Sequence, residues 1–356
     1  MKYYFKCNSR CGLLALILAA MVLSWSQAVF AVPESDLAVA FDAQVRPFIQ
    51  RHFITGSFTG TGGLTLRYRE REVENAVGIV VVVGGRTEFS SKYDELLYDL
   101  RDLPLTFYSV DHRGQGISDR LLSDKNKGHV VRFEDYVIDL SIFVDTIVRK
   151  KHKGPLVIIA HSMGGLVSAL YANSYPDSVQ GLILCSPMLG IKTSLLPTVA
   201  ARFLIQGACS LGFEDRYIFG CQSSDSGKSF SANKVTHSEA RFSLNQRLVA
   251  ETPDNALGNP TFGWINQAFV GMDHLAASHR QLVMPVLLLQ AEEDKVVRNA
   301  PQNALCRDLP ECTLVTLPGS GHEILMERDP VRNSALKRIR GFVGMIISKA
   351  TVERRS

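Results

Sequence analysis

The chain has 356 residues, of which 46% are hydrophobic and 21% charged, so it has enough apolar material for a large buried core. Its formal net charge is +4, and three of the positive charges lie in the first ten residues, which leaves the rest of the chain nearly neutral. This composition excludes a disordered or collagen-like protein, and without a basic stripe we expect no binding of nucleic acid.

The first 31 residues have the pattern of a secretory signal peptide. A positively charged start precedes an apolar run over residues 12–25, and Val29 and Ala31 place small residues at positions −3 and −1 of a cleavage site after Ala31. An uncleaved N-terminal anchor is the alternative, because residues 11–32 reach the ~20 residues that a membrane span needs. In both cases the positive-inside rule predicts an exported body that is periplasmic, secreted or anchored at the inner membrane.

The next segments in chain order predict a hairpin and then alternating strands and helices. Residues 57–68, with glycines at 60, 62 and 63, indicate an antiparallel hairpin. Unbroken, β-branched apolar runs then predict parallel strands buried on both faces, at 78–83, 106–110, 156–160, 182–185, 286–289 and 313–317. Helical patterns are found at 93–101, 133–149, 166–174 and 334–348. This alternation predicts an α/β protein with a mostly parallel, doubly wound sheet.

Residues 190–284 interrupt the alternation, because they contain no clear buried strand. Helix-like spacing appears around 238–251, and the strand pattern resumes directly afterwards. We therefore expect a helical cap inserted after the sixth strand, with residues 32–189 and 285–356 forming the core. A separate domain is the alternative. The apolar cap residues are expected to line an acyl-chain pocket or to form the cap's own core; they are Leu195, Leu196, Phe203, Leu204, Ile205 and Phe213.

Five of the seven cysteines lie beyond the leader, in a chain that is expected to be exported and therefore able to form disulfides. Their proximity in sequence favours the pairs Cys209–Cys221 and Cys306–Cys312, with Cys185 left unpaired inside a strand. No CxxC motif occurs, and the histidines show no ligand spacing, so neither a metal ion nor another cofactor is expected.

A nucleophile motif lies between the predicted strand at 156–160 and the helix that follows it. Residues 160–165 read Ala-His-Ser-Met-Gly-Gly, which is G-x-S-x-G with Ala160 in place of the first glycine. Such a turn strains the serine backbone and lifts its side chain to the helix N-terminus. We therefore predict Ser162 as the nucleophile and expect His161 to point away from it. A serine that merely caps a helix is the alternative.

The partners of the serine are sought in the order Ser, then Asp or Glu, then His. Asp294 follows the predicted strand at 286–289, with Glu292 and Glu293 as competitors. His322 lies in a glycine-rich loop after the last strand. We expect His322 to accept the serine proton and Asp294 to orient the imidazole and stabilise its charged form.

An oxyanion formed in the reaction needs two backbone N–H donors. The residue after the nucleophile, Met163, supplies one, and the loop after the strand at 78–83 supplies the other. Its position favours Arg86, with Gly85 as the alternative. Loss of such a donor typically costs about 2.7–4 kcal/mol of activation free energy.

Together these motifs resemble the bacterial inner-membrane lysophospholipases of the L-two type, which belong to the α/β-hydrolase superfamily and are related to monoglyceride lipases. The likeness covers roughly residues 50–345. It rests on the stretches Gly85-Arg86-Thr87-Glu88, Lys92-Tyr93, Asp99-Leu100, Asp111-His112-Arg113-Gly114-Gln115-Gly116, Ser118, Gly128-His129-Val130, Phe133, Asp135-Tyr136 and His161-Ser162-Met163-Gly164-Gly165. In the cap it rests on Asn233, Thr236-His237-Ser238, Arg241, Asn259-Pro260-Thr261 and Trp264.

The resemblance implies an α/β-hydrolase fold and hydrolysis of one acyl ester in a lysophospholipid or monoacylglycerol at a membrane surface. It also implies possible acyl transfer to another lipid, and it carries over Ser162, Asp294 and His322 as the catalytic residues. The leader is a departure from this family, because it predicts an exported enzyme, whereas the family resemblance implies an active site that faces the cytoplasm. The alternative function is that of an exported serine aminopeptidase or general carboxylesterase. A peptidase needs acidic groups for the substrate amine, and Glu239, Glu251 and Asp254 are the candidates.

Overall fold

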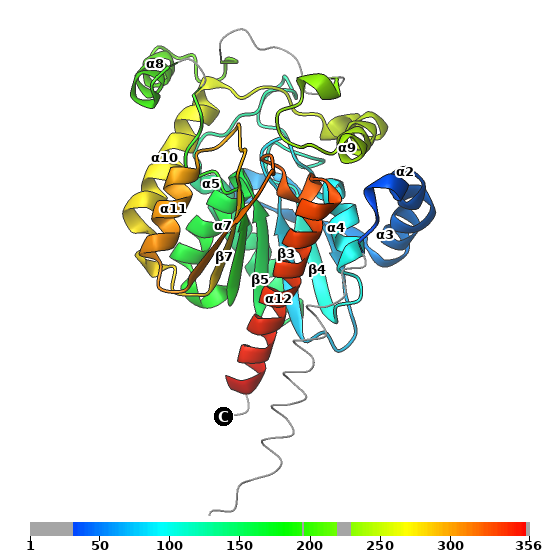
Figure 1. The fold of residues 1–356 in the computed structure, drawn as a ribbon. Coiled ribbons are helices and arrows are strands. Elements are labelled where there is room, and N and C mark those ends of the chain that lie inside the picture. The colour runs from blue at the N-terminus through cyan, green and yellow to red at the C-terminus, as the bar shows by residue number, and fades with distance from the viewer. Residues whose placement is uncertain (1–30, 194–195, 219–228, 354–356) are drawn as a thin grey trace, which may run out of the picture.

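The computed structural model describes residues 31–193, 196–218 and 229–353. They form an eight-stranded sheet in the order β1-β2-β4-β3-β5-β6-β7-β8 (Figure 1). The strands are β1 (Ile54–Thr59), β2 (Thr65–Arg71), β3 (Gly78–Val83), β4 (Leu105–Val110), β5 (Leu156–His161), β6 (Gly181–Cys185), β7 (Val286–Ala291) and β8 (Cys312–Leu317). β1 and β2 are antiparallel, β2 pairs antiparallel with β4, and all pairs from β4 to β8 are parallel.

Burial explains why the strands were predictable. β3, β4, β5, β6 and β7 are buried along their whole length, so their sequences are continuous apolar runs. β2 alternates buried and half-buried residues at the antiparallel end of the sheet. The predicted hairpin and all six predicted parallel strands are confirmed, with bounds that shift by at most three residues.

Helices cover both faces of the sheet, as expected of a doubly wound fold. One face carries α5 (Glu134–Phe143), α7 (Met163–Ser174) and α11 (Asn299–Asp308). The other face carries α2 (Leu37–Ala40), α3 (Arg46–His52), α4 (Asp94–Asp99) and α12 (Asp329–Glu353). A wider turn over Val144–Val148 continues α5 into α6 (Arg149–Lys151), so the helix predicted at 133–149 is present.

The segment between β6 and β7 contains α8 (Thr198–Ser210), α9 (Glu239–Glu251) and α10 (Phe262–Ser278). Figure 1 shows α8 and α9 beyond the carboxyl ends of the strands, whereas α10 lies beside the sheet. Trp264, Phe269 and Met272 of α10 are buried in the same apolar cluster as α7. The inserted segment therefore contributes both a cover over the strand ends and a helix of the flanking layer. Its treatment as a separate cap stays a prediction.

The apolar residues expected to line a pocket or to form a cap core mostly face solvent. Phe203 is 76% exposed, and Leu196, Leu204 and Phe213 are also exposed, whereas Ile205 packs against the main core. Leu195 lies outside the described residues. The expectation is therefore wrong for these four exposed side chains, because an apolar pattern on a helix does not tell which surface, if any, covers it.

The predicted disulfide between Cys306 and Cys312 is present and joins α11 to the start of β8. Cys185 is a buried free thiol on β6, as expected. Cys209 is also free, and its predicted partner Cys221 lies outside the described residues. Residues 1–30 of the leader lie outside them as well. In the part of the chain that the structure describes, no helix is both long and apolar enough to cross a membrane.

Candidate active site

Ser162 occupies a strained turn between β5 and α7. Its φ of 49° lies in the left-handed region that non-glycine residues rarely adopt, and the helix begins at the next residue, Met163. A Cβ atom on Gly164 would lie 2.4 Å from the carbonyl oxygens of Val83 and Gly84. Glycine is therefore required at this position, because the end of β3 approaches the first turn of α7 too closely for any side chain.

Three loops at the carboxyl end of the sheet bring Ser162, His322 and Asp294 together. His322 Nε2 lies 2.8 Å from Ser162 Oγ, and His322 Nδ1 lies 2.7 Å from Asp294 Oδ2. All three side chains are buried, with 7%, 5% and 2% of their surfaces exposed, respectively. The three residues predicted from the sequence therefore form one hydrogen-bonded line from hydroxyl to imidazole to carboxylate.

The second carboxylate oxygen of Asp294 accepts the backbone N–H groups of Val296 and Val297, at 2.7 and 2.8 Å. Burial alone would raise the pKa of Asp294, but the hydrogen bond and charge of His322 and these two N–H donors lower it below the usual value. The competitors point elsewhere: Glu292 accepts the N–H of Gly319, and Glu293 lies 3.7 Å from His237.

The loop after β3 lies against the serine. A Cβ atom on Gly85 would be 3.1 Å from the Cβ atom of Ser162. The N–H of Gly85 donates to the carboxylate of Glu88, so this donor is already occupied and Gly85 is disfavoured as an oxyanion donor. The guanidinium of Arg86 donates to the carbonyl of Gly258 and lies over the ring of Trp264, 5.3 Å from its centroid. The roles of the Arg86 and Met163 N–H groups stay a prediction.

Sequence reasoning assigned no role to Glu88, which holds this loop. Its buried carboxylate accepts from Tyr93 Oη at 2.5 Å, from Lys92 Nζ at 2.9 Å and from His161 Nδ1 at 3.0 Å. Lys92 also forms an ion pair of 2.8 Å with Glu323, the residue after His322. His161 points away from Ser162 Oγ, as expected, and ties the nucleophile strand to this cluster. The only sequence signal was that Glu88, Lys92 and Tyr93 belong to the family resemblance.

The charges of this cluster shift its pKa values. Burial would raise the pKa of Glu88, but the charges of His161 and Lys92 outweigh it and lower the pKa well below the usual value. Burial would lower the pKa of His161, but the Glu88 carboxylate outweighs it and raises the pKa. Both shifts favour the ionised forms of Glu88 and His161, although the cluster is enclosed beside the serine.

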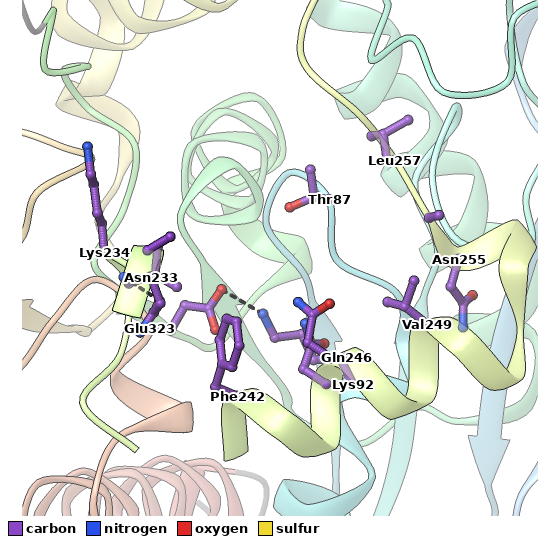
Figure 2. Close-up of a pocket in the computed structure, with 14 residues that line it drawn as sticks. Thr87, Lys92, Asn233, Lys234, Phe242, Gln246, Val249, Asn255, Leu257 and Glu323 are labelled. Atoms are coloured by element: carbon purple, nitrogen blue, oxygen red, sulfur yellow. Dashed lines mark hydrogen bonds and ion pairs between the residues drawn. The ribbon is translucent and has the colours of Figure 1, made fainter. Parts of the chain in front are cut away.

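A pocket of about 630 Å³ opens beside this site (Figure 2). Thr87, Lys92 and Glu323 line it; Thr87 belongs to the loop after β3, and Glu323 directly follows His322. Figure 2 shows Phe242, Gln246 and Val249 projecting from α9, opposite Thr87. The remaining lining residues are Ala232, Asn233, Lys234, Val235, Asn245, Asn255, Ala256 and Leu257. The lining therefore combines apolar side chains with amides and one exposed lysine.

The fold and the buried Ser162–His322–Asp294 line define a member of the α/β-hydrolase superfamily. A monoglyceride lipase from Saccharomyces cerevisiae, solved with a substrate analog, has this fold with a TM-score of 0.64 at 18% identity, covering 83% of this chain and 96% of that one. A carboxyl esterase from Bacillus coagulans gives 0.68 at 17% identity, covering 83% and 99%.

The family model of serine aminopeptidase, S33, matches residues 74–329, and the chain belongs to this family. Within it, the chain is 34% identical to lysophospholipase L2 of Escherichia coli K12 over 296 residues, covering 80% of this chain and 86% of that protein. It is 30% identical to a probable lysophospholipase L2 of Haemophilus influenzae, covering 85% and 96%. Monoglyceride lipase of Rattus norvegicus is 26% identical, covering 76% and 84%. The resemblance seen in the sequence is thereby confirmed.

Proposed function

We propose that this protein is a serine hydrolase that cleaves the acyl ester of lysophospholipids. The observation that carries the proposal is the buried line from Ser162 Oγ through His322 to Asp294. Similarity to the lysophospholipase L2 proteins supports the substrate class. Monoacylglycerols are related substrates, because they present the same ester between a fatty acid and glycerol.

The reaction proceeds through an acyl-enzyme. Neutral His322 accepts the proton of Ser162 as Oγ attacks the ester carbonyl carbon, and Asp294 stabilises the imidazolium that forms. The N–H groups of Met163 and Arg86 donate to the oxyanion of the tetrahedral intermediate. His322 then protonates the leaving glycerol oxygen. Water repeats the sequence on the acyl-enzyme and releases the fatty acid, and a second lipid alcohol in place of water would give acyl transfer.

The pocket beside the site suits an amphipathic substrate. Its apolar side chains, among them Phe242, Val249 and Leu257, offer a surface for hydrocarbon. Asn233, Asn245 and Gln246 offer hydrogen bonds to a polar head group. An entrance with both kinds of side chain is what a lysophospholipid requires, since it carries one acyl chain and one charged head.

Peptide hydrolysis is less well supported. Of the three acidic residues considered for binding a substrate amine, none lines the pocket, and Glu251 forms an ion pair of 2.8 Å with Arg46. Glu323 is the one carboxylate that lines this pocket in the described residues, and it is bound by Lys92. A substrate ammonium would therefore have to compete with an existing buried lysine.

We further propose that the catalytic body is exported and works on a membrane surface. The leader at residues 1–31 supports export. Exposed apolar side chains on and beside α8 support contact with lipid: Leu196, Val199, Phe203, Leu204 and Leu211. Figure 1 shows α8 at the same end of the sheet as the carboxyl ends of the strands. A protein bound to a membrane through α8 would therefore turn its active site toward the membrane that holds the substrate.

The test measures fatty acid release from lysophosphatidylethanolamine and monoacylglycerol, and aniline release from an amino-acid anilide, by the purified protein. We expect fatty acid release from both lipid esters and no cleavage of the anilide. Ser162→Ala should abolish the fatty acid release. Ser210→Ala is the matched control, because Ser210 is an exposed serine on α8 that bonds within its own helix. Undiminished hydrolysis by Ser162→Ala, or faster turnover of the anilide than of the esters, would overturn the proposal.

A further inference from the structure

The first residue beyond the predicted cleavage site is held by both of its backbone polar groups. Val32 is 5% exposed, and its backbone nitrogen lies 3.2 Å from Oδ1 of Asp99. The guanidinium of Arg241 donates to the carbonyl oxygen of Val32 at 3.3 Å. The Val32 side chain belongs to the apolar cluster on the α4 and α12 face of the sheet. The junction at Ala31–Val32 is therefore a point of tight attachment to the body.

The contacts of Val32 are part of a buried ionic cluster that joins three helices, α4, α9 and α12. Arg241 of α9 pairs with Glu95 of α4 and with Asp329 of α12, both at 2.9 Å. Arg332 of α12 pairs with Asp99 at 2.6 Å and with Glu95 at 3.2 Å. Both arginines and the carboxylates of Glu95 and Asp99 are at most 2% exposed.

Glu34 completes the cluster from the N-terminal side. Its carboxylate accepts from Ser238 Oγ at 2.6 Å and lies 4.0 Å from Arg241. Its backbone N–H donates to Asp329 at 2.8 Å. The residues that directly follow Val32 are therefore fixed to α9 and α12.

Among the residues that the structure describes, this cluster contains more negative than positive groups. Four carboxylates, those of Glu34, Glu95, Asp99 and Asp329, face the two guanidinium groups of Arg241 and Arg332. The neighbouring Arg340 donates to the carbonyl oxygen of Asp99 and forms an ion pair with Asp102.

Asp99, the carboxylate that lies beside the Val32 nitrogen, has a raised pKa. Burial raises the pKa of Asp99 to about 6, the charge of Arg332 opposes this shift, and Glu95 adds to it. A buried carboxylate that lacks a full countercharge is costly, so a further cation beside Asp99 would stabilise the fold.

We propose that cleavage after Ala31 creates a buried α-ammonium group on Val32 that forms an ion pair with Asp99. Water adds across the Ala31–Val32 peptide bond, so that Ala31 leaves as a carboxylate and the nitrogen of Val32 becomes an ammonium. The nitrogen already lies at hydrogen-bond distance from Asp99, so its charge changes with little movement. Free α-amino groups have pKa values of about 7.7–8, and neighbouring carboxylates favour the charged form.

Once the chain is cleaved after Ala31, the ion pair would hold α9, which forms one wall of the pocket, more firmly against the body. Arg241 lies on α9, the helix that supplies Phe242, Gln246 and Val249 to the pocket. A new cation at Val32 relieves the excess of carboxylates around Arg241 and Arg332, and it thereby strengthens the attachment of α9 to α4 and α12. This inference goes beyond the proposed ester hydrolysis and does not depend on it.

The test begins with the full-length chain produced in an exporting bacterium. The intact mass of the purified protein gives its first residue, which we expect to be Val32. The sample is then treated with 2-pyridinecarboxaldehyde, which modifies free α-amines, in native buffer and in urea. A buried, paired ammonium should react at least about tenfold more slowly in the native protein than in the unfolded one. A different first residue, or equal rates in both solutions, would overturn the proposal.

Two variants separate the ion pair from simple burial. Asp99→Asn should raise the native modification rate about tenfold, because a neutral amide holds the ammonium less firmly. Asp102→Asn is the control, since Asp102 lies three residues after Asp99 but pairs with Arg340 of α12, and it should leave the rate unchanged. Circular dichroism checks that each variant is folded, and the wild-type comparison remains decisive where Asp99→Asn does not fold. Hydrolysis of a soluble ester by the same samples reports on the proposed function separately.

Discussion

The imidazole of His161 connects the Glu88 carboxylate to the backbone of His322. Nδ1 lies 3.0 Å from Glu88 Oε1, and Nε2 lies 3.1 Å from the carbonyl oxygen of His322. A carbonyl oxygen can only accept, so Nε2 carries a proton, and an ionised carboxylate requires one on Nδ1 as well. His161 is therefore an imidazolium, with its ring centroid 4.8 Å from that of His322.

A fixed positive charge so close to His322 would oppose the second imidazolium that the reaction creates. Glu88 offsets this effect, because its charge neutralises His161 within the same enclosed cluster. The cluster also joins the loop after β3 to the loop that carries His322, through Lys92 and Glu323. We infer that Glu88 and His161 are positioning residues, since neither contacts the reacting atoms.

His161→Asn is expected to destabilise the protein in a pH-dependent manner. The pKa of His161 is raised in the folded protein above its unfolded value of about 6.5, so the stabilisation is complete below that pH. It is lost as the pH rises through the raised pKa. The difference in Tm between wild type and variant should therefore be largest at about pH 6 and should narrow at alkaline pH.

The loss at low pH corresponds to at most about 3 kcal/mol, because asparagine keeps one hydrogen bond of the pair. Thermal melts across the pH range measure it. His274→Asn serves as the control, since His274 is exposed on α10. A difference in Tm that does not vary with pH would contradict a charged His161.

Asp294→Asn should lower kcat by about 10⁴-fold, because an amide leaves the imidazole in the wrong tautomer and cannot stabilise its charge. The pKa of Asp294 is lowered, so it is a carboxylate throughout the neutral range and this loss should not depend on pH there. Hydrolysis of a soluble short-chain ester measures kcat. Glu293→Gln, which alters the neighbouring carboxylate, should stay within about threefold of wild type, and an equal loss in both variants would argue against the assignment.

Gly164→Ala should destabilise the fold by at least about 2 kcal/mol, because the new methyl group meets two backbone carbonyl oxygens that cannot move independently. Gly207→Ala is the matched control. Gly207 lies inside α8 and has open space around its Cβ position, so alanine should stabilise that helix by about 0.5–1 kcal/mol. Chemical denaturation of both variants distinguishes them, and similar free energies of unfolding would mean that the elbow tolerates a side chain.

The sequence allowed the central strands and the triad to be predicted because each carries a local signal. β3, β5 and β6 are buried on both faces and therefore read as unbroken apolar runs. Ser162 lies between such a strand and a helix, and His322 lies five residues after the end of β8. In an α/β sheet, chain order and strand ends are enough to bring these residues to one edge.

Buried charged residues explain why the start of α12 was not predicted. α12 was predicted over 334–348 but begins at Asp329, because Arg332 and Arg340 make a buried helix face look polar. Each is matched by an aspartate more than 200 residues earlier in the chain. Such pairs have no period in the sequence. The short N-terminal helices α2 and α3 were also missed, although they contain no buried charge.

The exposed apolar face of α8 predicts reversible binding to lipid vesicles. Val199 and Phe203 are 80% and 76% exposed, and as i and i+4 residues they lie on the same side of the helix. Burying two such side chains in a bilayer contributes roughly 1.5–3 kcal/mol each, so Val199→Asp combined with Phe203→Asp should weaken binding by at least about tenfold. Co-sedimentation with phosphatidylethanolamine–phosphatidylglycerol vesicles measures this, and turnover of a soluble ester should remain unchanged.

Val283→Asp supplies the control for this pair. Val283 is also exposed, at 57%, but it precedes β7 and so lies at the amino end of the strands, away from α8. Its substitution should leave vesicle binding intact. If the α8 double variant and the control bind vesicles equally well, the contact surface lies elsewhere. If both lose binding equally, the effect comes from added negative charge, which anionic lipids repel, and the apolar face of α8 has no specific part in it.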